Sequence, residues 1–187
     1  MSRLARVHWL LIAIGAVAWV CYIAIYYGGM ALRGEWESWN LVLHNLYSPG
    51  EALANLSIGL HLVAGALITL IAPLQLLPSV RARAPKVHRV LGRIYIGAAL
   101  IAGIGGTLFI LLRGAVGGPV MSVGFGLYGV LVVIAALLAL RHARRRELVQ
   151  HRAWALRLFA LGLSSLLFRY EYSLWGLFTG MATHDPV

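Results

Sequence analysis

Five long apolar runs constrain this chain more than any other feature. A helix needs about 20 mainly apolar residues to cross the hydrocarbon core of a bilayer. Of the 187 residues, 60% are apolar and only 12% are charged, whereas a soluble domain has about 25% charged residues. The sequence therefore predicts an all-α membrane protein, a single helical bundle with five transmembrane helices. The predicted spans are residues 7–30, 52–77, 90–112, 119–140 and 154–178.

Local signals support several of these boundaries. The segment Ser48-Pro49-Gly50-Glu51 has the pattern of a capping box, so the second span should begin directly after it. Pro73 should kink that span and Pro78 should end it. The first run is longer than the apolar core of a cleaved signal peptide, which has about 7–15 residues. We therefore expect this run to be a retained membrane anchor.

The distribution of basic residues predicts the orientation. Thirteen of the 16 Lys and Arg residues precede the first span or lie in the segments 81–93 and 141–157. The other three, Arg33, Arg113 and Arg169, fall on the opposite side. The positive-inside rule then places the N-terminus in the cytoplasm and the C-terminus outside. The net charge of +10 is therefore explained by membrane orientation and anionic lipid at the cytoplasmic face, and nucleic acid is not an expected partner.

The segment 33–47 between the first two spans is too polar to cross the bilayer. Trp36, Trp39, Leu43 and Tyr47 recur in it at three- and four-residue spacing. This spacing predicts a short helix in the outer interface with its aromatic side toward lipid. An irregular loop with interfacial tryptophans is the alternative.

Histidines at membrane depth provide the main functional signal, because ionisable residues inside a bilayer are costly and usually functional. His88 and His151 lie at the cytoplasmic ends of the third and fifth spans, at similar depth. Gly92 follows His88 by one helical turn, which predicts room for a flat ligand against the backbone. The cofactor-binding residues expected around the two histidines are Gln75, Arg89, Arg93, Arg152 and Trp154.

A second polar group lies toward the outer surface. His61 lies roughly 24 Å along the second span from its inner end, so His61 and His88 cannot bind one iron. Arg169 and Glu171 lie near the outer end of the fifth span. The submerged Arg169 should pair with Glu171 or with a ligand. These three residues are also the candidate site of a small proton-linked transporter.

The histidines support two interpretations. Neutral imidazoles on facing helices hold b-type haem or a metal in helical bundles, and neighbouring arginines can neutralise haem propionates. This favours a b-type haem electron carrier that reaches a quinone or a membrane-protein partner, with His61, His88 and His151 as candidate metal ligands.

In the alternative interpretation, the arginines orient the protein and bind lipid headgroups, and His61 bonds a carbonyl across a helix interface. The protein is then a non-enzymatic lipid- or small-molecule-binding protein, or an accessory subunit of a larger membrane complex. The sequence has no haem-attachment motif, zinc-protease motif, phosphate-binding loop or nucleophile elbow, so no catalytic residue is assigned.

Several of these segments together resemble one known family. The segments are His61-x-x-x-Gly65, Pro73-Leu74-Gln75, Arg81-x-Arg83-x-Pro85-x-x-His88-Arg89-x-x-Gly92-Arg93-x-Tyr95 and His151-Arg152-x-Trp154. Over roughly 56–169 the chain is similar to the predicted bacterial membrane proteins of domain-of-unknown-function family 2306. The resemblance implies a multi-pass protein of the bacterial inner (plasma) membrane. It implies little about activity, but it includes the same histidines and arginines that membrane depth singles out.

Overall fold

The chain is built from helices throughout the part that the structure describes. The computed structural model describes residues 3–179 and is 87% helical, with no strand in this range. The predicted all-α class is therefore confirmed. The long helices are α1 (Arg3–Tyr22), α3 (Ala52–Leu76), α5 (Pro85–Arg113), α6 (Gly118–Arg144) and α7 (Leu148–Thr179). The short elements are the π-helix η1 (Ile23–Gly28), α2 (Gly29–Leu32), the 3-10 helix η2 (Trp36–Leu41) and α4 (Pro78–Arg83).

Within the described residues, four helical segments are long and apolar enough to cross a membrane. They are the continuous run Arg3–Leu32, together with α3, α5 and α6. The predicted fifth span lies in α7, which is 32 residues long but carries the charged residues Arg157, Arg169 and Glu171 along its length. Membrane crossing by α7 therefore stays a prediction. So does the side on which each terminus lies, because residues 1–2 and 180–187 are outside the described part of the chain.

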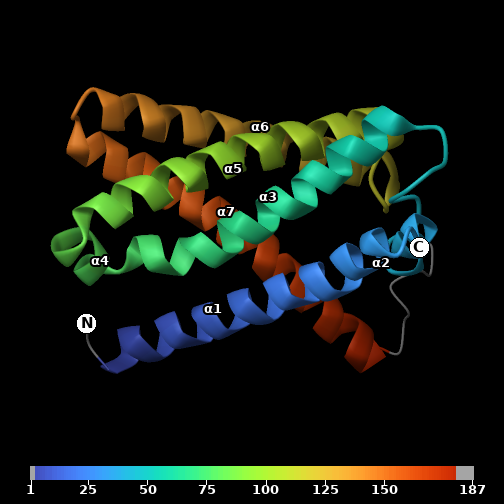
Figure 1. Cartoon of the computed structure of the whole chain (residues 1–187), viewed down its shortest axis with the longest axis horizontal. Coiled ribbons are helices and arrows are strands. Elements are labelled where there is room, and N and C mark those ends of the chain that lie inside the picture. The colour runs from blue at the N-terminus through green and yellow to red at the C-terminus, as the bar shows by residue number, and fades with distance from the viewer. Residues whose placement is uncertain (1–2, 180–187) are drawn as a thin grey trace.

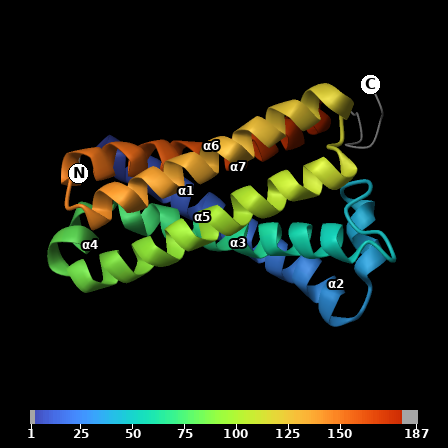
Figure 2. The same ribbon diagram turned by 90° about the horizontal axis from the view of Figure 1, so that it is seen from above.

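The long helices form a bundle in which neighbours along the chain pack together. Figure 2 shows α3 beside α5 and α6 beside α7, and these pairs have extensive contacts. The start of α1, the short helix α4 and the α6–α7 connection lie at one end of the bundle, and α2 lies at the other (Figure 1). We call the first the basic end, because the segments 3–6, 81–93 and 141–157 contain thirteen of the 16 Lys and Arg residues.

Glycines allow α3 and α5 to approach closely. A Cβ atom at Gly105 would lie 2.8 Å from the backbone oxygen of Ser57, and one at Gly106 would lie 2.6 Å from the Nδ1 atom of His61. The backbones of the two helices are therefore nearly in contact here. Such close packing of small residues is a common way for helices to associate in a bilayer, where lipid is as apolar as the side chains.

The start of α3 differs in detail from the sequence prediction. The helix begins at Ala52 without a side-chain cap from Ser48. The Asn55 side chain instead bonds both backbone groups of Ser48, at 3.1 Å to the nitrogen and 2.7 Å to the oxygen. Pro73 lies inside α3, and Pro78 is the first residue of α4, as expected for a helix-ending proline.

Trp39, on the aromatic side of segment 33–47, faces the protein. Trp39 lies in η2 with only 5% of its surface exposed, and its indole N–H donates to the Tyr27 carbonyl at 3.1 Å. Tyr26 donates to the Ser38 carbonyl at 2.8 Å. The expectation that Trp39 points toward lipid was therefore wrong. The physical reason is that η1 presents a carbonyl and a set of aromatic rings to Trp39, which the sequence pattern does not reveal.

Candidate functional site

The predicted histidine pair lies at the basic end. His88 is in the first turn of α5 and His151 in the first turn of α7, and the two are within electrostatic range of each other. The Nδ1 atom of His151 lies 2.9 Å from the Ala139 carbonyl oxygen. A carbonyl only accepts hydrogen bonds, so Nδ1 carries the proton and Nε2 keeps a lone pair for a ligand.

His88 has an unsatisfied ring nitrogen. Its Nδ1 atom is buried and has no hydrogen-bond partner within residues 3–179. Buried polar atoms are normally bonded, and leaving one unpaired costs about 1–3 kcal/mol. A ligand that bonds to this nitrogen would remove that cost, which makes the position a candidate ligand contact.

The predicted space beside Gly92 is occupied by the Gln75 amide. Gln75 donates from Nε2 to the His88 carbonyl at 3.3 Å, and its Oε1 would lie 3.7 Å from a Cβ at position 92. The glycine thus accommodates a cross-helix contact between α3 and α5 that narrows the expected space, and the binding of a flat ligand there stays a prediction.

The basic and aromatic residues around the pair have different environments. Arg89, Arg93 and Arg152 are exposed and available to an anionic group. Trp154 instead packs on the core formed by α3, α5, α6 and α7, and the Arg157 guanidinium lies 4.6 Å from its ring centre. Trp154 is therefore part of the packed core near His151.

His61 is separate from this pair and part of the α3–α5 interface. Its Nδ1 lies 2.8 Å from the Ala102 carbonyl oxygen, and its ring lies against Gly106. Only Nε2 could therefore bind a ligand. Among the described residues, no group of three or more His, Cys, Asp or Glu side chains could hold a metal ion.

Sequence analysis missed an aromatic environment around Arg169. The guanidinium lies 5.1 Å from the ring centre of Trp19 and bonds to the carbonyl and the hydroxyl of Ser165. It is within electrostatic range of His61, Tyr27 and Tyr128. Five elements, α1, η1, α3, α6 and α7, therefore converge on this arginine. The sequence signal for this site was a basic residue within an apolar helix. Its partners could not be predicted, because they depend on how helices that are distant in the sequence pack together.

Glu171, the expected partner of Arg169, is exposed. The described partners of Arg169 belong instead to α1 and to the preceding turn of α7. His61 and Arg169 therefore lie within electrostatic range of each other, whereas Glu171 is exposed, and the transporter hypothesis stays a prediction.

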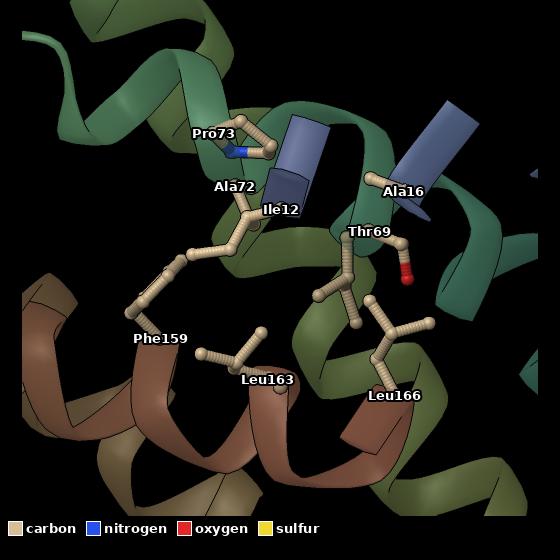
Figure 3. Close-up of a pocket in the computed structure, with 10 residues that line it drawn as sticks. Ile12, Ala16, Thr69, Ala72, Pro73, Phe159, Leu163 and Leu166 are labelled. Atoms are coloured by element: carbon tan, nitrogen blue, oxygen red, sulfur yellow. The ribbon is translucent and has the colours of Figure 1, made fainter. Parts of the chain in front are cut away.

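Two cavities lie away from the histidine pair. Figure 3 shows a small crevice between α1, α3 and α7, with Ile12, Thr69 and Phe159 among its lining residues. Its volume of about 20 Å³ is enough for about one water molecule. The second is an apolar groove of about 270 Å³ between α3 and α5. Neither is lined by His88 or His151.

Three features define the chain as an integral membrane protein of the polytopic helical class. Its helices are long and apolar, many of their Leu, Ile and Val side chains are exposed, and its basic residues gather at one end. Residues 58–184 match the family model described as "Predicted membrane protein (DUF2306)", and this match covers more than half of the chain. The chain belongs to that family. Comparisons with curated proteins and with solved structures give no match.

Proposed function

We propose that this membrane protein binds a b-type haem between His88 and His151. The observation that carries the proposal is the buried Nδ1 of His88, which has no partner among the described residues and lies within electrostatic range of His151, whose own Nδ1 is bonded to the Ala139 carbonyl. A fixed tautomer with a free second nitrogen is the usual state of a ligating histidine. Two neutral imidazoles would hold the iron of a b-type haem, and the exposed Arg152, next to His151 in the sequence, would bind a propionate.

The proposed role is electron transfer. Haem would supply one-electron chemistry, and a quinone or a membrane-protein partner would exchange electrons with it. We further propose that α7 crosses the bilayer as the fifth span and that the basic end faces the cytoplasm of a bacterial inner membrane. The asymmetric distribution of Lys and Arg supports this orientation.

Optical spectra test the haem proposal directly. We expect the purified protein, supplied with haem, to show a sharp b-type band on dithionite reduction. His88→Ala and His151→Ala should each lose nearly all of this band, because each removes an axial ligand. His8→Ala is the matched control, since His8 is exposed on α1 and bonded only to the Leu4 carbonyl at 2.8 Å. A featureless spectrum from folded protein, or equal losses in all three variants, would contradict the proposal.

A second candidate function is the binding of a lipid or another small apolar molecule without redox chemistry. The apolar groove of about 270 Å³ between α3 and α5 favours it, because every residue that lines the groove is apolar. This candidate and the haem carrier can coexist, since the groove and the histidine pair are made of different residues.

A further inference from the structure

We infer that the groove between α3 and α5 binds one acyl chain of an anionic phospholipid, and that Arg93 and its basic neighbours hold the phosphate of that lipid. This inference does not depend on haem, because none of the groove residues belongs to the histidine pair. It assigns a defined lipid site to one face of the protein, beyond general contact with the bilayer.

The groove has a floor of small residues and walls of branched ones. Ala64 and Ala98 form the floor together with Gly97, and both alanines are buried. Larger side chains form the walls and project beyond this floor. Val63, one of the wall residues, is 62% exposed. The lining residues are Leu60, Val63, Ala64, Leu67, Ile94, Gly97, Ala98 and Ile101. The result is an apolar depression that is open toward the surrounding lipid.

The dimensions of the groove suit an acyl chain. The lining residues extend from Leu60 to Leu67 on α3 and from Ile94 to Ile101 on α5, which is roughly 10 Å of helix in each case. An α-helix with its side chains is about 10–12 Å wide and does not fit into a volume of about 270 Å³. A single hydrocarbon chain is narrow enough to lie between the walls.

The groove leads toward a cluster of positive charge. Val90 lies one turn before Ile94 and is 51% exposed, so the apolar stripe of α5 continues toward the basic end. Arg93 lies one turn before Gly97, and Lys86 and Arg89 precede it on the same helix. All three basic side chains are exposed.

No acidic residue is available nearby in the sequence to neutralise this cluster. The chain contains no Asp or Glu between residues 52 and 146, a range that includes all of α3, α4, α5 and α6. Glu147 in the α6–α7 connection pairs with His142, so an anion from outside the chain would complement Arg93, Arg89 and Lys86. The combination of an apolar channel at membrane depth and cations at its end matches a phospholipid with a negative headgroup, and a basic residue near the surface adds about 1 kcal/mol to such binding.

Native mass spectrometry in detergent can measure the binding of single lipids. The probes are phosphatidylglycerol and phosphatidylcholine with identical palmitoyl and oleoyl chains, so that the two lipids differ only in the headgroup, which is anionic in the first and zwitterionic in the second. We expect the wild type to bind phosphatidylglycerol about fivefold more tightly than phosphatidylcholine. Arg93→Gln should lower the affinity for phosphatidylglycerol about fivefold. Arg144→Gln, which changes an exposed arginine of α6, should leave this affinity unchanged.

A second pair of variants tests the groove itself. Gly97→Leu places a side chain in the groove, and its Cβ meets no atom within 4 Å, so the helix packing is preserved. It should weaken the binding of both lipids about tenfold, because a leucine displaces several methylene groups from apolar contact. Gly124→Leu is the matched control, since position 124 on α6 is equally open and does not line the groove. Circular dichroism and thermal unfolding confirm that each variant is folded.

Four results would overturn the inference. Equal affinity of the wild type for both lipids would exclude a specific anionic site. Equal effects of Gly97→Leu and Gly124→Leu would exclude the groove, and equal effects of Arg93→Gln and Arg144→Gln would exclude the headgroup contact. Self-association in detergent that Gly97→Leu abolishes would show instead that a second copy of the chain covers this face. None of these measurements uses a haem spectrum. Failure of the lipid inference can therefore be distinguished from failure of the haem proposal.

Discussion

Replacing Trp39 by alanine is expected to lower the free energy of unfolding by about 3–5 kcal/mol, as for other large buried aromatic residues. Trp39 is almost fully buried in η2, which packs against α2 at the end of the bundle opposite the basic end. Its ring centre lies 5.5 Å from that of Tyr27 and 5.3 Å from that of Trp36, in edge-to-face arrangements. The substitution leaves a cavity, removes both ring contacts and leaves the Tyr27 carbonyl without its indole donor.

Two further variants separate these contributions. Trp39→Phe keeps an aromatic ring but removes the N–H donor, so it should cost about 1 kcal/mol from the hydrogen bond, plus a smaller packing loss. Trp36→Ala is the matched tryptophan control, and it should cost clearly less than Trp39→Ala because Trp36 is 40% exposed. Reversible unfolding in mixed micelles with increasing sodium dodecyl sulfate measures all three. If Trp36→Ala and Trp39→Ala had equal effects, the buried position assigned to Trp39 would be incorrect.

The sequence predicts the general architecture well because hydropathy and charge act locally. The apolar runs alone identify the helical segments, and prolines such as Pro78 mark helix boundaries. The basic residues gather at one end because α4 and the α6–α7 connection both lie there (Figure 1). These properties depend on short stretches of chain and not on which helices become neighbours.

The details of the candidate site depend on tertiary packing, and the sequence does not predict them. The spacing of His88 and Gly92 predicts room beside the glycine, but it does not show that the Gln75 amide of α3 lies there. Membrane depth identifies Arg169 as a residue that needs partners, but Trp19, near the other end of the chain, is one of them. A π-helix such as η1 changes which way Tyr27 points, and π-helical segments have no reliable sequence signature.

The α3–α5 interface should tolerate no side chain at Gly105. Gly105→Ala is expected to destabilise the bundle by about 1–3 kcal/mol, the usual cost of overpacking. The added Cβ would lie 2.8 Å from the backbone oxygen of Ser57. Backbone atoms cannot move aside as a flexible side chain can, so the two helices have to separate.

Separation of these helices would also affect His61, because its bond to the Ala102 carbonyl crosses the same interface at 2.8 Å. Gly97→Ala on the same helix provides the matched control, since a Cβ there meets no atom within 4 Å. Alanine is also the better helix former by about 1 kcal/mol, so Gly97→Ala should be neutral or stabilising. The unfolding titration used for Trp39 measures both variants. Equal stability of the two would show that α3 and α5 do not approach each other as closely at Gly105 as the structure places them. A loss confined to Gly105→Ala would establish that backbone contact between α3 and α5 holds this part of the bundle together.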